Sequence, residues 1–223
     1  MRGAGPRKVP RSPYKVLDAP ALQDDFNLNL IDWSSHNVLV VGLGNCVYLW
    51  NACSSKVTKL CDLGVDDNVC SVGWAQHGIH LAVGTNQGKV QDATRCKRIR
   101  TMESHRMRVG ALAWSSSFLS SRSRDKSILH HDIHAQEDYV SKLTGHKSEV
   151  CGLMWSYDNR QLASGGNDNR LFVWNPHSVQ PVLSTQQLSK LLPGHLISMA
   201  CLHLMEEPQI DAYDFGIRPQ IHT

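Results

Sequence analysis

Histidine, serine and aspartate recur in this sequence at spacings that could support acid–base chemistry. The set comprises His105, Ser121 and Asp125 in one segment and His146, Ser164, Asp168 and Trp174 in the next. A histidine beside a carboxylate, such as His146 with Asp168, could act as a catalytic dyad. Because the pattern repeats in register, a structural role is favoured: a buried hydrogen-bonded chain whose partners offset the desolvation of each polar group. We therefore expect no catalytic residue and no enzyme.

The run His130-His131-Asp132-Ile133-His134 is a second candidate for chemistry, as a metal cluster. On the predicted strand here, His130 and His134 share one face and His131 lies on the other. No cysteine or further carboxylate stands at convincing ligand spacing. The sequence also lacks a glycine-rich phosphate loop, a nucleophile elbow and a paired-carboxylate motif. We expect no metal and no cofactor.

Composition limits the remaining classes of protein. The net charge of +3 is mild, and the basic stretch Arg95–Arg108 lacks interleaved aromatics, so nucleic-acid binding is only a weak alternative. The longest apolar stretch, Val38–Trp50, is too short to span a bilayer, and Met1–Arg11 has no signal-peptide core. Seven cysteines without a CxxC pair fit buried thiols of a reducing compartment. We expect a protein of the nucleus and cytoplasm with no membrane partner.

The elements that carry these residues are repeats. Trp33, Trp74, Trp114 and Trp155 each end a segment with alternating apolar residues, at spacings close to 40. Alternation of this kind predicts a half-buried strand. The first strands are expected at Leu28–Ser34, Val69–Ala75, Val109–Ser115 and Val150–Ser156; second and third strands follow, such as Val38–Val41 and Arg170–Trp174. Units of short strands at this period predict propeller blades.

Two repeats depart from the pattern. The second reads Gly88-Lys89-Val90-Gln91-Asp92-Ala93 and lacks about two residues, including the Trp, relative to Leu171–Asn175. Such a loss keeps the strand facing but is expected to shorten the strand ladder. In the third repeat, Arg122 stands where the fourth has Gly165. If the backbone there needs a glycine conformation, Arg costs about 1 kcal/mol or more.

The G-H … S-x-x-x-D … W phrases are those of WD repeats, and from about Arg7 to Leu183 the chain resembles the Fizzy-related group. That group comprises WD-repeat activators and substrate receptors of the anaphase-promoting complex, a ubiquitin ligase. The shared phrases include Tyr14–Pro20, Gln23–Phe26, Val109–Ser115, Ser123–Lys126 and Leu162–Asn169, and Arg95–Arg100 is similar to the plant branch. The resemblance implies a partial WD40 β-propeller, all-β, with about four of the family's seven blades.

The resemblance also implies the binding residues. Family members grip destruction-box and KEN degrons of cell-cycle substrates. The family's acidic partner for the destruction-box arginine corresponds to Asp18, which suits a charge-assisted fork. The KEN-binding residues correspond to Asp25 and Phe26, and to Asn167 and Asn169, whose amides pair with a short polar peptide. For all of them, a solvated turn residue is the alternative. Separately, Ser12-Pro13-Tyr14-Lys15 fits a proline-directed phosphorylation site at Ser12, or else a mere linker.

The expected organisation is a basic arm and linker at 1–25, blades at 26–183 and a divergent tail at 184–223. The sequence shows no C-box, five residues follow Ile217-Arg218, and a short helix is expected around Leu196–Leu204. An open set of blades leaves strand edges and apolar faces exposed, so we expect a marginal product that aggregates or needs a partner. The expected partners are anaphase-promoting complex subunits and degron-bearing substrates. The alternatives are a WD-repeat scaffold of another complex and a nonfunctional or competing fragment.

Overall fold

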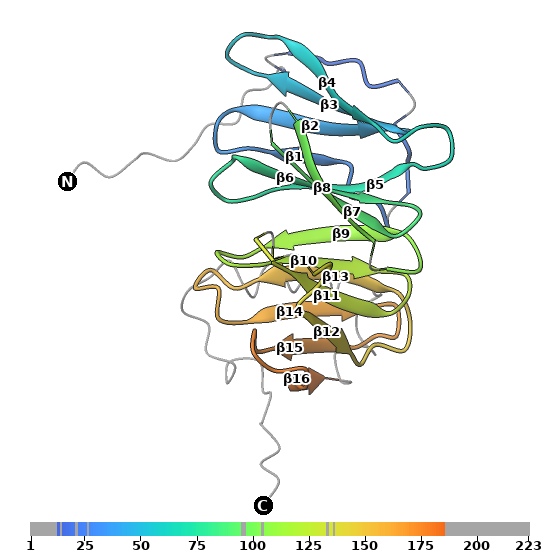
Figure 1. The fold of residues 1–223 in the computed structure, drawn as a ribbon, viewed down its shortest axis with the longest axis vertical. Helices are drawn as coiled ribbons and strands as arrows, with labels where there is room; N and C mark the ends of the chain where they lie inside the picture. Colours follow the sequence, from blue (N-terminus) through green and yellow to red (C-terminus); the bar gives the residue numbers. More distant parts are fainter. Residues whose placement is uncertain are drawn as a thin grey trace, which may run out of the picture.

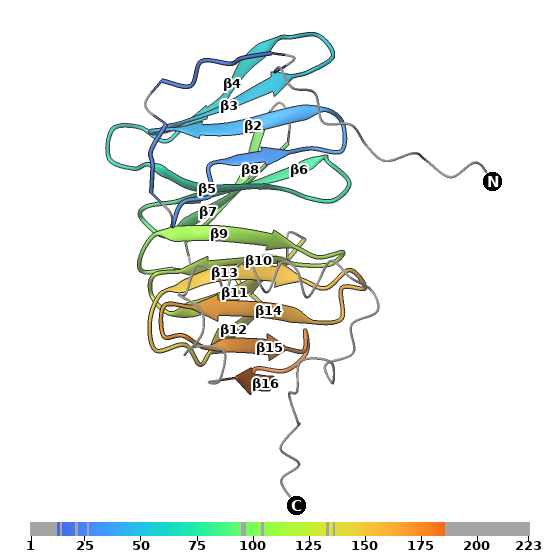
Figure 2. The same ribbon diagram turned by 180° about the vertical axis from the view of Figure 1, so that it is seen from behind.

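The computed structural model describes residues 13, 15–20, 22–25, 27–94, 97–103, 105–132, 134–135 and 137–185. These residues form four antiparallel sheets of four strands each, and the strands of a sheet follow one another in chain order. Figures 1 and 2 show the sheets in sequence along the long axis, from the blue sheet to the orange one. The expected all-β fold of repeated blades is confirmed, and no helix occurs within the described ranges.

The strands have the following bounds. The first sheet contains β1 (Ile31–Trp33), β2 (Val38–Leu43), β3 (Cys46–Asn51) and β4 (Val57–Asp62). The second contains β5 (Val69–Trp74), β6 (His80–Thr85), β7 (Lys89–Thr94) and β8 (Lys97–Glu103). The third contains β9 (Val109–Trp114), β10 (Leu119–Ser123), β11 (Ser127–His131) and β12 (Ser141–Thr144). The fourth contains β13 (Val150–Trp155), β14 (Leu162–Gly166), β15 (Leu171–Trp174) and β16 (Pro181–Thr185).

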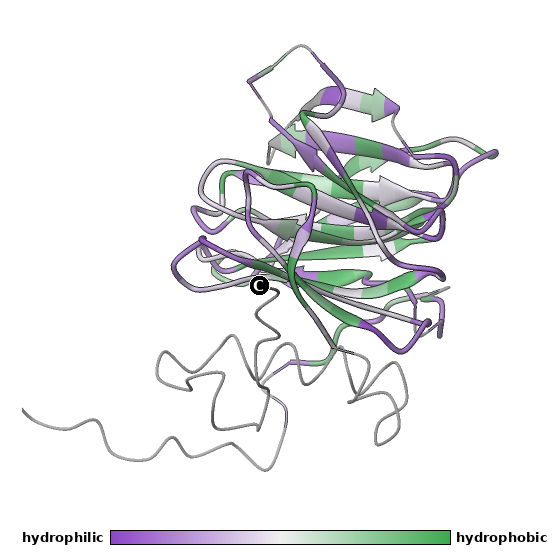
Figure 3. Ribbon diagram, turned by 90° about the horizontal axis from the view of Figure 1, so that it is seen from below, coloured by the Kyte–Doolittle hydropathy of each residue, from purple (hydrophilic) through white to green (hydrophobic). Residues whose placement is uncertain are grey.

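Hydrophobic residues collect between successive sheets and form three clusters. One joins the first two sheets around Val40, Val72 and Leu81. Another joins the second and third sheets around Val90 and Leu112, and the last joins the third and fourth. Figure 3 shows the apolar colour along the strands and the polar colour at the loops that join them. Burial of this apolar surface is the main force that holds one sheet against the next.

In the second, third and fourth sheets, the tryptophan of the first strand connects its sheet to the preceding one. The indole N–H of Trp114 donates to the Gly73 carbonyl at 2.9 Å, and that of Trp155 donates to the Ser120 hydroxyl at 3.0 Å. Trp74 donates its backbone N–H to Asp32 in the first sheet at 2.6 Å. Trp33 has no such sheet before it in the described structure, and it is 51% exposed.

The turn between the second and third strands has the same geometry in three sheets. Its fourth residue has a left-handed backbone: Gly88 with φ 85°, Lys126 with φ 72° and Asn169 with φ 57°. In the fourth sheet the turn is fixed by the Asn167 N–H, which donates to the Glu149 carbonyl at 2.8 Å. This turn therefore projects side chains from the same edge of each sheet.

The two-residue loss of the second repeat lies in a different place from the one expected. Ala93 pairs with Leu81 just as Trp174 pairs with Leu162, so the β6–β7 ladder is complete and not shortened. The loss falls in the outer hairpin. Ala93 pairs with residue 98, whereas Trp174 pairs with Pro181 and Trp50 with Val57. The hairpin of the second sheet thus has two residues fewer, and Ala93 takes the place of the tryptophan.

Arg122 does not need the backbone of a glycine. Neither Arg122 nor Gly165 is among the positive-φ residues, so the condition for strain is not met. The Arg122 side chain is buried, and its guanidinium donates to the Val150 and Gly110 carbonyls. Burial lowers the pKa of Arg122 to about 10. The cost at this position is therefore desolvation of a charge, not backbone strain.

Several expectations concern residues near the ends of the chain. Strand β16 runs to Thr185 and so crosses the expected boundary of the tail at 184. The helix expected around 196–204 lies outside the described residues. No helix in the described ranges is long and apolar enough to cross a membrane.

Candidate functional site

One arginine, Arg108, binds two carboxylates that come from different segments of the chain, Glu149 and Asp25. We call these three residues the Arg108 fork. Arg108, directly before β9, donates to both carboxylate oxygens of Glu149, directly before β13, at 3.1 and 3.3 Å. Its third nitrogen donates to Asp25 at 3.0 Å. A guanidinium fits two carboxylates in this way because its donors are planar and fixed. Burial acts to lower the pKa of Arg108, but Glu149 and Asp25 outweigh it and raise that pKa.

Asp25 is oriented by a neighbouring residue as well as by Arg108. The Asn27 backbone N–H donates to its carboxylate at 2.9 Å. This bond, together with the charge of Arg108, holds the pKa of Asp25 below its usual value. An ionised, oriented carboxylate at this point can accept from a peptide only with the lone pairs that Asn27 and Arg108 leave unused.

Asn167 is brought to the same fork, and Asn169 lies in the same turn. Asn167 donates its N–H to the Glu149 carbonyl, and its side-chain oxygen accepts the Cys151 thiol at 2.9 Å. The Asn167 amide NH₂ group is not engaged in that contact. The left-handed backbone at Asn169 is one that asparagine tolerates better than most residues. Its residue type is therefore explained by the turn whether or not it binds a ligand.

The other expected binding residues do not join this fork. Asp18 is exposed in a segment without helix or strand, and within the described part no hydrogen bond or ion pair connects it to Arg108. The same segment approaches the first sheet, where the Lys15 ammonium lies 5.3 Å from the centre of the Trp50 ring. Phe26 and Ser12 lie outside the described residues.

Sequence reasoning missed Arg108 and Glu149 as site residues. Each stands directly before a first strand, so the two occupy the same position of successive repeats. An arginine and a glutamate at equivalent positions of adjacent repeats is the signal that could have identified the fork. The sequence groups Arg108 with the basic stretch Arg95–Arg108, and much of that stretch forms β8, the outer strand of the second sheet.

The fourth sheet contains the hydrogen-bonded chain inferred from the WD phrase. His146 contacts Asp168 through Nδ1 at 3.1 Å and Ser164 through Nε2 at 2.9 Å. The Trp174 indole N–H donates to the same Ser164 hydroxyl at 2.8 Å. Burial lowers the pKa of His146, against the opposing pull of Asp168. With the imidazole and hydroxyl both engaged and buried, the arrangement is that of a structural link.

The third sheet keeps the chain but ends it differently. His105 contacts Asp125 at 3.0 Å and Ser121 at 2.7 Å. His131 takes the place of the tryptophan and contacts Ser121 at 2.6 Å. Hydrogen bonds from His105 and Ser127 outweigh the effect of burial and lower the pKa of Asp125.

The histidines of the 130–134 run do not gather around one point. His130 is buried and contacts the Ser120 hydroxyl, so it faces a different partner from His131. His134 lies beyond the end of β11, which corrects the expectation that it shares a strand face with His130. Within the described ranges, no group of three or more potential ligands could hold a metal ion.

Comparison with known proteins gives the relatives of these sheets. The WD domain, G-beta repeat family matches residues 137–175. The B-type cell cycle switch protein ccs52A of Medicago truncatula is 83% identical over 180 residues, covering 80% of this chain and 38% of the relative. Protein FIZZY-RELATED 2 of Arabidopsis thaliana is 82% identical over 180 residues, covering 80% of this chain and 37% of the relative.

A more distant relative and a solved structure are also similar to this chain. The anaphase-promoting complex subunit cdh1 of Dictyostelium discoideum is 54% identical over 177 residues, covering 78% of this chain and 23% of the relative. A chain in the crystal structure of the mitotic checkpoint complex superposes with a TM-score of 0.76 at 41% identity, covering 83% of this chain and 60% of that one. The partial WD-repeat propeller is thus confirmed, and the chain spans less than two fifths of the length of these curated relatives.

Proposed function

This chain belongs to the Fizzy-related group of WD-repeat proteins, whose members match 80% of its length, and we propose that it is a degron receptor of the anaphase-promoting complex. In this role it binds destruction-box and KEN sequences of cell-cycle substrates and catalyses no reaction itself. Its partners are subunits of the ligase and the substrates that carry those degrons. We further propose that it acts in the nucleus and cytoplasm and that Ser12 is a phosphorylation site.

The single observation that carries the proposal is the Arg108 fork. It holds Asp25 at a fixed place and, through the Glu149 carbonyl, also the turn that carries Asn167. Two of the residues that the resemblance assigns to KEN binding come from segments more than a hundred residues apart, yet one cation joins them. Preorganisation of this kind lowers the ordering cost when a short polar peptide binds.

The burial of the dyad-like pair His146 and Asp168 supports a non-catalytic role for it. The side chains of His146 and Asp168 are 1% and 6% exposed. The Ser164 hydroxyl is shared between His146 and Trp174. A nucleophile so engaged has no approach for a substrate, which fits a binding protein better than an enzyme.

A KEN-bearing peptide titrated against the full chain tests the proposal. We expect Asn167→Ala to weaken binding about tenfold, the loss of a hydrogen bond to a charged or polar ligand group. Asn169 is replaced by Gly, because Ala would add backbone strain at its positive φ. Asn86→Ala is the matched control, since Asn86 makes the same turn contact in the second sheet. Equal affinity for all four proteins rejects the assignment.

The destruction box is tested separately through Asp18. Because this carboxylate is exposed, Asp18→Asn leaves folding unchanged and is expected to weaken an Arg-x-x-Leu peptide by several fold, more at low salt than at high salt. Asp24→Asn, an exposed aspartate nearby, is the control. Capture only of partners without either degron would select a WD-repeat scaffold of another complex instead.

A further inference from the structure

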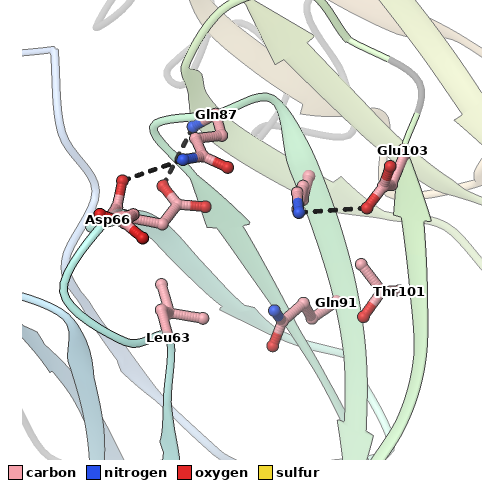
Figure 4. A pocket seen from close by; sticks show the side chains of 8 residues that line it. Leu63, Asp66, Gln87, Gln91, Thr101 and Glu103 are labelled. Atoms are coloured by element: carbon pink, nitrogen blue, oxygen red, sulfur yellow. Dashed lines mark hydrogen bonds and ion pairs between the residues drawn. The ribbon is translucent and has the colours of Figure 1, made fainter.

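A polar cavity of about 420 Å³ opens in the second sheet, and none of the residues of the Arg108 fork lines it. It lies between the loop that leads into β5 and the outer strands β7 and β8. Figure 4 shows Asp66 and Leu63 on the loop side and Gln91 and Glu103 on the strand side. Neither the resemblance nor the proposed function assigns any role to it.

The cavity occupies the space that a histidine fills in the fourth sheet. Gln91, which pairs with Val83, occupies the register position in the second sheet that Phe172, which pairs with Ser164, occupies in the fourth. In the fourth sheet the His146 ring packs on Phe172 with the two centres 4.7 Å apart. In the second sheet the residue at the histidine position is Val65, which is 94% exposed and turned away. The missing ring leaves a hollow next to Gln91.

The walls of the hollow carry more negative than positive charge. Asp66, Asp67 and Glu103 supply carboxylates, and Lys89 supplies the one cation among the lining residues. The Lys89 ammonium lies 3.1 Å from Glu103, so that pair is neutral. Asp67 is 6% exposed and accepts the backbone N–H of Gln87 at 3.0 Å. The remaining charge of the walls is negative, and such a site attracts cations.

The floor of the cavity has an acceptor with no donor. Gln91 is 5% exposed, and its buried side-chain oxygen has no hydrogen-bond partner among the described residues. A buried acceptor without a donor destabilises the fold unless a ligand supplies the missing hydrogen bond. A ligand that brings both N–H donors and positive charge would answer the oxygen of Gln91 and the carboxylates together, while Leu63 offers an apolar wall for an alkyl stem.

We propose that this cavity binds the alkylammonium or guanidinium head group of a lysine or arginine side chain from a bound polypeptide. The head group donates to the Gln91 side-chain oxygen and lies beside Asp66 and Asp67, the two lining carboxylates that Lys89 does not neutralise. The residues that line this site do not include those of the Arg108 fork.

The test uses the full chain and two probes, butylammonium and ethylguanidinium, in titrations followed by NMR of the Gln91 side-chain amide. We expect a saturable shift for at least one probe, weakened by added salt. Gln91→Leu should weaken the response about tenfold. Leucine is a sound replacement because Leu129 occupies this register position in the third sheet. Gln91→Glu should tighten binding.

Asp66→Asn is a second variant, exposed enough to leave the fold unchanged, and it should weaken both probes by several fold. Gln180→Leu, at an exposed glutamine of the fourth sheet, is the matched control and should bind like the unmodified chain. For Gln91→Leu, where that amide is absent, binding is followed through the Thr101 backbone resonance. A response that never saturates, or that is equal in the Gln91→Leu and unmodified proteins, overturns the proposal.

Discussion

The Nε2 atom of His131 lies 2.6 Å from the Ser121 hydroxyl, where the fourth sheet has an indole N–H donating to Ser164 at 2.8 Å. This exchange alters the proton count of the chain. His131 also faces the Asp138 carbonyl through Nδ1 at 2.5 Å. The chain from Asp125 through His105, Ser121 and His131 to that carbonyl has four contacts, and each contact needs one proton. Two neutral imidazoles and one hydroxyl supply only three protons. In the fourth sheet, three groups supply three protons for three contacts.

The first prediction is that His131→Trp stabilises the protein. The indole N–H completes the chain without a charge, so the free energy of unfolding at pH 7 should rise by about 1 kcal/mol. Because a Cβ at Gly145 would lie 3.1 Å from the Trp174 ring, the variant is made with Ser104→Gly, which precedes His105 as Gly145 precedes His146. Urea denaturation measures the change. Ser104→Gly alone is the control, and no gain from the added Trp would contradict the proton count.

A second prediction concerns acid. Burial lowers the pKa of His130 and of His131 to about 4, from an ordinary value near 6.5. The unfolded chain therefore binds more protons between pH 6.5 and 4, and stability should fall as the pH drops through this window. The slope is at most about 1.4 kcal/mol per pH unit for each histidine. The free energy of unfolding, measured from pH 7 to 4.5, should depend less steeply on pH in His131→Trp than in the unmodified protein. An unchanged slope would refute the claim that His131 is buried without a charge.

The third prediction tests the link in the fourth sheet. Ser164→Ala removes the partner of both His146 and Trp174, leaving two buried polar groups unpaired. We expect the free energy of unfolding to fall by about 2–4 kcal/mol. Ser116→Ala, at an exposed serine, is the control and should change stability by less than about 0.5 kcal/mol. An equal effect of the two substitutions would show that the link contributes nothing to stability.

The fourth prediction follows from the register of β7. Asp92 stands where the fourth sheet has Val173, is 3% exposed, and contacts His80 at 3.3 Å. Burial raises the pKa of Asp92 above the ordinary value for an aspartate. The contribution of Asp92 to stability is therefore lost as the pH rises from that ordinary pKa through the raised one. Asp92→Asn keeps the acceptor for His80 and removes the buried charge. We expect about 1 kcal/mol of added stability at pH 7, with Asp24→Asn unchanged.

The strand pattern could be predicted from the sequence because each first strand ends in tryptophan. That residue marks both the alternation of apolar side chains and the place where a sheet meets the preceding one. The second repeat could not be aligned in the same way, since it has no tryptophan in its third strand. The pairings of Ala93 with Leu81 and with residue 98 together locate the missing residues in the outer hairpin. Backbone pairing, and not residue type, decides the register there.

The candidate site was only partly predictable for a similar reason. The turn residues Asn167 and Asn169 belong to a local phrase, and the phrase is readable from one segment. The fork of Arg108 joins residues that are far apart in the chain and belong to different segments. Its members become neighbours only when the sheets are placed side by side. The cavity beside Gln91 is a similar case, because it arises from the absence of a ring that a neighbouring repeat supplies.

The shortened hairpin of the second sheet has a consequence for how such repeats can change over time. The inner strands and the turn that follows them keep their spacing, while the outer hairpin absorbs the whole loss. Insertions and deletions at the rim are thereby insulated from the edge that carries Asn167 and its equivalents. The outer hairpin of a sheet can therefore vary in length while the turn between its second and third strands keeps its position in the sheet.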